Sequence, residues 1–276
     1  MGVFSASNQK MTAYKAVRYG HTLHRLSAKE VRGMKTLAVI PARYASTRLP
    51  GKAVIPIAGI PLVVRVLQNV QRCSSVDRVV VAADDERIAA LVRQNGGEAI
   101  MTPPELPSGG DRVAFVSKLI PSDYVLNVQV DDPLVASDMI DPLVKSLDES
   151  PSTVLSLLAK RIERQEEVDA KDIVKMVFSK SGSALYFSRS PIPYPRCDGG
   201  VWYKHIGPYC WRRDFLLEFS GWPQTPLEKT ESLEMLRVLE RGYSIRCVET
   251  ERDTIEIDTP DDLKKIEAYL SAITVP

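Results

Sequence analysis

The feature that most constrains the fold is a regular alternation of short apolar runs and helical stretches that begins after Lys35. Buried strands are continuous apolar runs of four to eight residues, whereas helices show apolar residues at a period near 3.6. Strands that alternate with helices in this way form a parallel sheet. The predicted strands are Thr36–Pro41, Arg78–Ala83, Glu98–Met101 and Tyr124–Gln129, and the predicted helices run from Pro61 to about Arg72, Asp85 to Gln94, Asp111 to Leu119 and Ser137 to about Leu147.

After Pro151 the pattern changes to strand-like runs and a proline-rich stretch, which predicts an antiparallel or mixed part of the sheet. A last helix is expected after Asp258, because Thr259 and Asp262 have the spacing of a capping box. The other elements expected here are strands Val154–Ala159, Val174–Phe178, Ala184–Ser188, Tyr203–Trp211 and Ser244–Thr250, and a helix from about Glu231 to Arg241.

Length and charge limit the classes of function. A chain of 276 residues suits one large domain or a domain with an insertion, and 36 basic against 35 acidic residues give a net charge of +1. A nucleic-acid or membrane-surface partner is therefore not indicated, and no apolar run is long enough to span a bilayer. The cysteines have no metal-site or disulfide spacing and are expected to be reduced: Cys73, Cys197, Cys210 and Cys247.

The loop from Pro41 to Lys52 follows the first strand and holds three cations, Arg43, Arg48 and Lys52. Cations and exposed backbone N–H groups at the carboxyl end of a strand suit a triphosphate that leaves as pyrophosphate. The glycine spacing matches neither a Walker A loop nor a dinucleotide fingerprint. The alternative is a solvated basic loop without a ligand.

Acidic residues follow two of the predicted strands. Asp131 and Asp132 follow the strand that ends at Gln129, and Asp258 precedes the last helix. Mg²⁺ is held by one or two carboxylates together with phosphate oxygens and water. Turn-filling or helix-end acids are the alternatives. Together with the basic loop, the acids predict metal-assisted phosphoryl or nucleotidyl transfer, and no serine–histidine triad stands out.

The sequence resembles the 3-deoxy-manno-octulosonate (Kdo) cytidylyltransferases, also called CMP-Kdo synthetases. The likeness covers residues from Met34 to about Leu270. The motifs that carry it are Ile40-Pro-Ala-Arg-Tyr-Ala-Ser-Thr-Arg-Leu-Pro-Gly-Lys52, Ser108-Gly-Gly-Asp-Arg112, Asn127-Val-Gln-Val-Asp-Asp-Pro133, Ala184-Leu-Tyr-Phe-Ser-Arg189, His205-Ile-Gly-Pro-Tyr209, Pro226-Leu-Glu228, Glu231-Ser-Leu-Glu-Met-Leu-Arg237 and Asp258-Thr-Pro-Asp-Asp-Leu263.

The resemblance implies an α/β, Rossmann-like nucleotide-diphospho-sugar transferase fold and CMP transfer from CTP to Kdo, releasing pyrophosphate, for lipopolysaccharide biosynthesis. It implies Mg²⁺ on Asp131 and Asp258, a cytoplasmic enzyme and a homodimer. The implied catalytic residues are Arg43, Arg48, Lys52, Asp131 and Asp258. The implied nucleotide-binding residues are Arg43, Ser46, Lys52, Ser108, Arg112 and Gln129, and the implied sugar-binding residues are Arg189, His205, Tyr209, Glu234 and Met235.

Two departures from the family pattern bear on the substrate. Where the family usually has Gly-Asp-Glu-Pro, this chain has Val130-Asp131-Asp132-Pro133, and where it usually has glutamine after Glu234, this chain has Met235. Loss of an amide from a sugar pocket can change preference sharply. The alternatives left open are 8-amino-Kdo or another 3-deoxy-2-ulosonic acid, another nucleotide or sugar, and a sugar-nucleotide-binding homologue without activity.

We predict a cytidylyltransferase domain over residues 34–270, with a sugar-binding and dimerisation part at about 185–245 and a tail at 271–276. Residues 1–33 contain six Lys or Arg, one acid and no apolar periodicity. They are expected to form a disordered appendage, with a transit peptide, an upstream translation start or an added tail as its possible origins.

Overall fold

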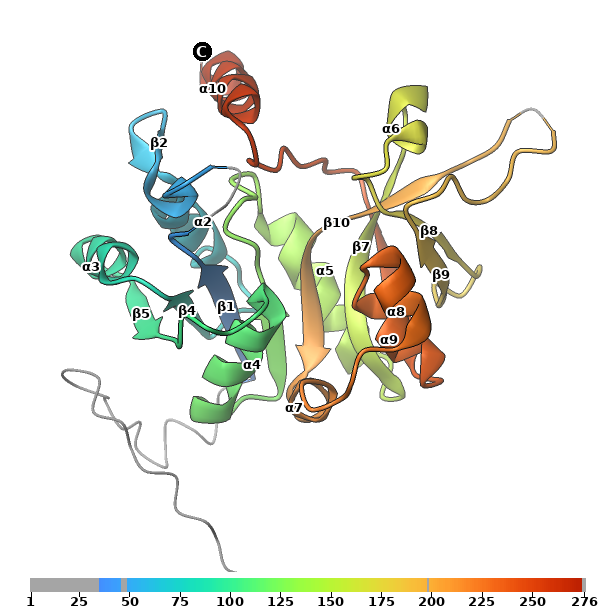
Figure 1. The fold of residues 1–276 in the computed structure, drawn as a ribbon, viewed down its shortest axis with the longest axis horizontal. Coiled ribbons are helices and arrows are strands. Elements are labelled where there is room, and N and C mark those ends of the chain that lie inside the picture. The colour runs from blue at the N-terminus through green and yellow to red at the C-terminus, as the bar shows by residue number, and fades with distance from the viewer. Residues whose placement is uncertain (1–34, 46–48, 198, 275–276) are drawn as a thin grey trace, which may run out of the picture.

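The computed structural model describes residues 35–45, 49–197 and 199–274. The appendage predicted at residues 1–33 lies outside them. A mixed sheet forms the centre of the molecule, and helices cover both of its faces (Figure 1). The strand order is β11-β7-β10-β6-β1-β4-β5. Their bounds are β1 Thr36–Ala42, β4 Arg78–Ala83, β5 Glu98–Met101, β6 Tyr124–Asn127, β7 Thr153–Arg161, β10 Tyr203–Arg212 and β11 Ser244–Thr250.

Shorter elements and helices complete the fold. The hairpin strands are β2 Pro56–Ile57 and β3 Ile60–Pro61, and β8 Lys175–Phe178 pairs with β9 Ala184–Ser188 beside β10. The helices are η1 Lys52–Val54, α2 Leu62–Val70, α3 Glu86–Gln94, α4 Gly109–Leu119, α5 Ser137–Asp148, α6 Gln165–Asp169, α7 Arg213–Phe219, α8 Pro226–Glu231, α9 Met235–Glu240 and α10 Pro260–Thr274. Within the described ranges, no helix is both long and apolar enough to cross a membrane.

The first half of the sheet is parallel, as predicted. β1 pairs in parallel with β4 and β6, and β4 pairs in parallel with β5. Every residue of β1 is buried, which is why its sequence is an almost unbroken apolar run. This arrangement brings the carboxyl ends of β1, β4 and β6 to one edge of the sheet.

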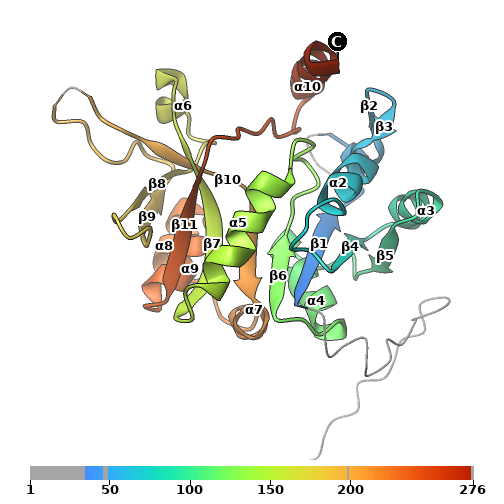
Figure 2. The same ribbon diagram turned by 180° about the vertical axis from the view of Figure 1, so that it is seen from behind.

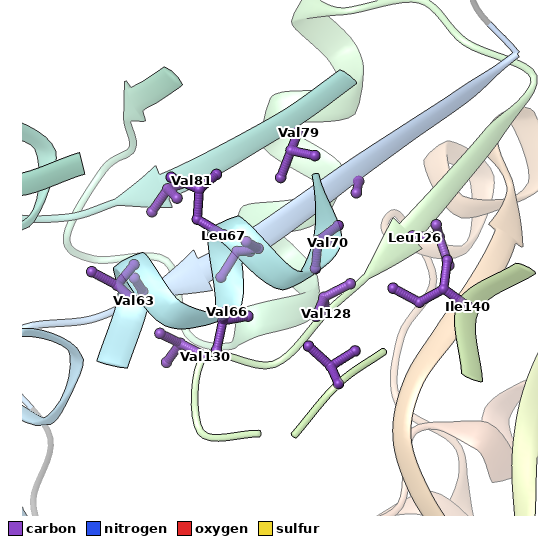
Figure 3. Close-up of a cluster of buried hydrophobic side chains, with 14 of the residues drawn as sticks. Val63, Val66, Leu67, Val70, Val79, Val81, Leu126, Val128, Val130 and Ile140 are labelled. Carbon is purple, nitrogen blue, oxygen red and sulfur yellow. The ribbon is translucent and has the colours of Figure 1, made fainter. Parts of the chain in front are cut away.

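Each face of the sheet has its own apolar core. The helices α2, α3 and α5 pack on one face, and α4, α7 and α9 pack on the other (Figures 1 and 2). Figure 3 shows how one stripe of α2 contacts the sheet through Val63, Val66, Leu67 and Val70. Their spacing of three and four residues keeps all four side chains on one side of the helix.

The second half of the sheet is mixed, which confirms the prediction. β10 runs antiparallel to β6 and β7, and β11 runs parallel to β7. The pairing of β10 with β7 shifts between Ile206 and Tyr209, where Gly207 has a φ of 52°. This bulge lies beyond the end of β6, because Tyr209 pairs with Asn127, the last residue of β6.

One predicted helix is wrong at its start. Instead of a single helix from Glu231 to Arg241, α8 ends at Glu231 and α9 begins at Met235. Ser232 separates them in the left-handed region, with a φ of 55°. The short helix α7 was not predicted.

The start of the last helix is confirmed. The backbone N–H of Thr259 donates to the Asp262 carboxylate, and the backbone N–H of Asp262 donates back to the Thr259 hydroxyl. This helix, α10, extends to Thr274 and so includes most of the predicted tail.

Candidate active site

Three side chains that sequence analysis selected meet at the sheet edge formed by the ends of β1 and β6. The ammonium of Lys52 lies 2.9 Å from Asp131 Oδ2 and 3.0 Å from Asp258 Oδ1. Lys52 is the first residue of η1, and Gly51 before it turns the loop with a φ of 70°. The N–H of Gly51 donates to Tyr44 O, which closes the loop. A cation and two carboxylates are thus held in one cluster.

The cluster depends on a long connecting segment. Residues 251–259 run from β11 across the sheet edge to α10, as Figure 1 shows at the upper edge of the molecule. The N–H of Ile257 donates to the carbonyl of Asp131 at 3.0 Å and fixes this segment against the turn after β6. Asp258 is therefore placed beside Asp131 although more than 120 residues separate them in the chain.

The charges of the cluster alter its protonation. Burial lowers the pKa of Lys52, but its pairing with Asp131 and Asp258 outweighs this, and the net pKa is raised. Desolvation and repulsion from the neighbouring carboxylates raise the pKa of Glu256. The cluster therefore favours the charged form of Lys52 and the protonated form of the nearby Glu256, a residue that sequence analysis did not select.

The donor set fits a magnesium ion. Two carboxylates converge on one positive centre, the Lys52 ammonium, and Mg²⁺ commonly uses one or two carboxylates together with phosphate oxygens and water. Across the described residues, no cluster of three or more His, Cys, Asp or Glu side chains forms a complete metal cage. An ion at Asp131 and Asp258 would take its remaining ligands from a nucleotide and from solvent.

The departures in the turn after β6 have structural consequences. Val130 is buried in the core below α2 and has no positive φ, so a branched residue is accommodated without strain where the family usually has glycine (Figure 3). Asp132 is 1% exposed and points toward the β10 bulge. It accepts a hydrogen bond from the N–H of Leu134 at 3.1 Å. Burial raises the pKa of Asp132 to about 6.

The predicted nucleotide-binding residues that the structure describes lie directly after β1, at the starts of η1 and α4, and in the turn after β6. Arg43 is exposed directly after β1. Ser46 and Arg48 lie outside the described residues. Ser108 is the N-cap of α4 and accepts a hydrogen bond from the N–H of Asp111.

Arg112 differs from an exposed ligand-binding cation. Its side chain is fully buried and donates to Thr102 Oγ1 at 2.6 Å and to Pro103 O at 3.0 Å. These bonds hold the loop between β5 and α4. Arg112 therefore supports this loop from inside the fold.

Three of the predicted sugar-binding residues lie near one another: His205 and Tyr209 are on β10, and Glu234 directly precedes α9. The hydroxyl of Tyr209 donates to Glu234 Oε1 at 2.6 Å. Desolvation raises the pKa of Glu234 despite this hydrogen bond. His205 lies on β10, four residues before Tyr209. Burial lowers its pKa to about 4, so its ring is neutral at pH 7.

Two other predicted sugar residues take different positions. Arg189 follows β9, and its Nε donates to Glu231 O at 2.9 Å. Met235 is 6% exposed and packs in the core between α9 and the sheet. The residue that replaces the family glutamine is thus directed toward the core.

Sequence analysis also missed the part played by Asn127. This residue ends β6, is 1% exposed and donates to the Tyr209 hydroxyl at 2.8 Å. Its Oδ1 accepts a hydrogen bond from Gln129 Nε2 at 3.0 Å. A polar side chain at the end of an otherwise apolar strand was the available signal.

A separate cavity of about 650 Å³, between β7 and α6, contains none of the predicted site residues.

Comparisons with known proteins show the family to which the chain is similar. A family model described as cytidylyltransferase matches residues 37–250. The 3-deoxy-manno-octulosonate cytidylyltransferase of Syntrophotalea carbinolica is 44% identical over 250 residues, covering 87% of this chain and all of the relative. The enzyme of the same name from Geotalea uraniireducens is 45% identical over 245 residues, covering 84% of this chain and 98% of the relative.

A solved structure is similar over the same length. It is described as CMP:2-keto-3-deoxy-manno-octonic acid synthetase complexed with CTP. It superposes with a TM-score of 0.83 at 37% identity and covers 87% of this chain and 99% of its own. The nucleotide-diphospho-sugar transferase fold expected from the sequence is therefore confirmed.

Proposed function

This chain belongs to the cytidylyltransferase family, and we propose that it transfers CMP from CTP to the anomeric 2-hydroxyl of Kdo, releasing pyrophosphate. The observation that carries the proposal is the cluster of Lys52, Asp131 and Asp258 at the sheet edge. It occurs in a chain that aligns over almost the full length of enzymes named for this reaction. The product would serve lipopolysaccharide biosynthesis.

The chain's own residues account for charge and position. Arg43 and Lys52 would neutralise the triphosphate, and the flexible stem of Lys52 lets its ammonium turn from the carboxylates to a phosphate. The 2-hydroxyl would attack the α-phosphorus in line, and the bond to pyrophosphate would break. Most of the rate would come from orientation and charge neutralisation, without a covalent enzyme intermediate.

Asp131 and Asp258 are the proposed holders of Mg²⁺. Such an ion supplies positive charge to the phosphates and lowers the pKa of a hydroxyl that approaches it. The two aspartates would hold the ion, and Ile257 keeps the connecting segment in place through its hydrogen bond to the carbonyl of Asp131. A dedicated general base is then not required.

The sugar-acid pocket is proposed to include Arg189, His205, Tyr209 and Glu234. Arginine suits a sugar carboxylate, and the phenol and carboxylate suit hydroxyl groups. Met235 favours testing a second sugar, because an apolar residue stands where the family usually has an amide. The second candidate is therefore the same reaction on 8-amino-Kdo or another 3-deoxy-2-ulosonic acid.

The direct test is a substrate panel. The protein is incubated with Mg²⁺, each of the four common ribonucleoside triphosphates and each of three acids, namely Kdo, 8-amino-Kdo and a sialic acid. Release of pyrophosphate and formation of a CMP-sugar, measured by mass spectrometry, are expected with CTP and Kdo. Product with a different nucleotide would contradict CMP transfer, and CTP binding without product from any acid would favour a non-catalytic homologue.

Asp131→Asn tests the proposed metal site. Loss of one carboxylate charge should reduce turnover by about 100-fold or more and weaken Mg²⁺ binding, while the melting temperature stays near that of the wild type. Asp141→Asn is the matched control, because Asp141 is a hydrogen-bonded carboxylate whose partners are Ser74 and Ser75, away from the cluster. Full activity of Asp131→Asn would refute the metal assignment.

Assembly and compartment are proposed on separate grounds. We propose a homodimer formed through the 185–245 part, because the extension between β9 and β10 projects from the body and exposes 84% of Tyr194 (Figure 1). We propose a reducing cytoplasm, because Cys73, Cys210 and Cys247 are buried free thiols. Sedimentation would report the dimer directly.

A further inference from the structure

Four polar side chains form a continuous row across the sheet edge. Gln129 Nε2 donates to Asn127 Oδ1 at 3.0 Å, and Asn127 Nδ2 donates to the Tyr209 hydroxyl at 2.8 Å. That hydroxyl donates to Glu234 Oε1 at 2.6 Å. The row joins the turn after β6, β6 itself, β10 and the residue before α9.

The direction of the hydrogen bonds follows from the chemistry of the groups. A carboxylate only accepts, so the Tyr209 hydroxyl donates its proton to Glu234. The amide nitrogen of Asn127 must then face Tyr209, which leaves its oxygen to accept from Gln129. Asn127 thereby sets the orientation of two side chains at once.

Burial makes Asn127 the fixed member of the row. Asn127 is 1% exposed and Tyr209 is 6% exposed, and both lie in the paired strands β6 and β10. The Asn127 amide is shielded from water, and both of its hydrogen bonds are made to protein groups. Hydrogen bonds in such surroundings are costly to leave unmade.

Both ends of the row border the start of α4. A Cβ added to Gly109 would lie 3.8 Å from Gln129 Oε1, and one added to Gly110 would lie 3.1 Å from Glu234 Oε2. Because the two glycines have no side chains, space remains beside Gln129 and beside Glu234. Gln129 presents its carbonyl oxygen on the side assigned to the nucleotide, and Glu234 lies on the side assigned to the sugar acid.

We propose that Asn127 is a positioning residue that fixes the Gln129 amide for the nucleotide and the Tyr209 hydroxyl for the sugar acid. This inference rests on the proposed function. Asn127 touches neither substrate in this account. It acts on the nucleotide side through Gln129 and on the sugar side through Tyr209.

The test is a double-mutant cycle on the full-length protein with Asn127→Leu, Tyr209→Phe and the double variant. Asn127→Leu should raise the KM for CTP and the KM for the sugar acid by about tenfold each, as expected for one buried hydrogen bond per side. In the double variant, the KM for the sugar acid should equal that of Tyr209→Phe alone, whereas the CTP effect should persist. A purely structural role would not produce this separation.

Ser156→Ala is the matched control. Ser156 is also a fully buried polar residue in a strand of the sheet, and its hydroxyl donates to Leu143 O. Its loss should leave both KM values unchanged. If Asn127→Leu does not fold, Asn127→Asp replaces it, because Asp keeps the acceptor for Gln129 and removes the donor to Tyr209. That variant should raise only the KM for the sugar acid.

Additive effects of Asn127→Leu and Tyr209→Phe on the sugar KM, or unchanged KM values in a folded variant, would overturn the inference. A wild-type protein that makes no CMP-sugar would instead refute the proposed function. The inference is then decided by calorimetry with CTP alone. A dissociation constant about tenfold higher for Asn127→Leu, but not for Ser156→Ala, supports it, and equal constants refute it.

Discussion

Asp131 and Asp132 are neighbours in the chain, yet their carboxylates lie in different surroundings. Asp131 pairs with the Lys52 ammonium at the sheet edge, whereas Asp132 is buried and points toward Gly207 in the β10 bulge. The two side chains leave the turn after β6 in different directions. The pair therefore divides into one candidate metal ligand and one interior acid that braces the turn.

The interior acid gives a prediction about stability. Burial raises the pKa of Asp132 to about 6 from an ordinary value of 3.8. Between these values the folded state binds more protons than the unfolded state, so stability falls as pH rises from about 4 to about 6. Over this range the free energy of unfolding falls by about 3 kcal/mol, since the pKa differs by about two units and each unit corresponds to about 1.4 kcal/mol.

Asp132→Asn should remove this contribution. We expect the free energy of unfolding of the variant, relative to wild type, to rise over pH 4 to 6 and to stay constant above that range. Urea titrations without Mg²⁺ at a series of pH values measure the difference, which also cancels the titration of unrelated groups. A difference that does not change with pH would contradict the assignment.

For single residues, the sequence predicted which residue types form the site better than it predicted where each side chain points. It selected Lys52, Asp131 and Asp258 because charged groups after strands gather at one edge of a parallel sheet, and the structure brings these three together. It could not foresee that Arg112 is buried. That outcome depends on the loop between β5 and α4, whose path no periodic pattern specifies.

At the scale of elements, the β10 bulge links the sheet to the site. The register between β10 and β7 shifts between Ile206 and Tyr209, which turns this part of β10 toward the turn after β6. Gly207 adopts a φ of 52°, a conformation that residues with a side chain rarely take. A Cβ there would lie 3.1 Å from Asp132 Oδ2.

Gly207→Ala should therefore destabilise the fold by about 1–3 kcal/mol and lower kcat, because the displaced Asp132 adjoins Asp131. Gly96→Ala is the matched control: Gly96 also has a positive φ, of 75°, but a Cβ there meets nothing within 4 Å. Gly96→Ala should lower the free energy of unfolding only by the cost of the backbone strain, and kcat should not change. Equal effects of both variants in thermal unfolding and kinetics would show that the contact with Asp132 contributes nothing to stability or activity.

The elements also show where pattern reading fails. The strands of the main sheet were predicted closely, because buried apolar runs end where polar loops begin, whereas the short hairpin strands β2 and β3 were not predicted. One helix was predicted from about Glu231 to Arg241, but Ser232 takes a left-handed conformation and separates α8 from α9. An ion pair between Arg237 and Glu228 holds the two short helices together across that break. Such tertiary contacts override a periodic signal.

At the scale of the whole molecule, the strand order explains why distant residues share one site. Lys52 follows β1, Asp131 follows β6, and Asp258 returns from β11 along the segment that crosses the sheet edge (Figure 2). The parallel half could be predicted from alternation alone. The position of β10 between β6 and β7 could not, because the local pattern indicates an antiparallel or mixed region but does not specify the order of its strands.

In the proposed reaction, the 2-hydroxyl of a 3-deoxy sugar acid attacks the α-phosphorus of CTP. NMR with Kdo enriched in ¹³C at C2, CTP and Mg²⁺ follows this bond as it forms. We expect release of pyrophosphate and a product whose C2 signal is split by one phosphorus atom. Release of inorganic phosphate instead, or a C2 signal that stays unsplit while CTP is consumed, would contradict it.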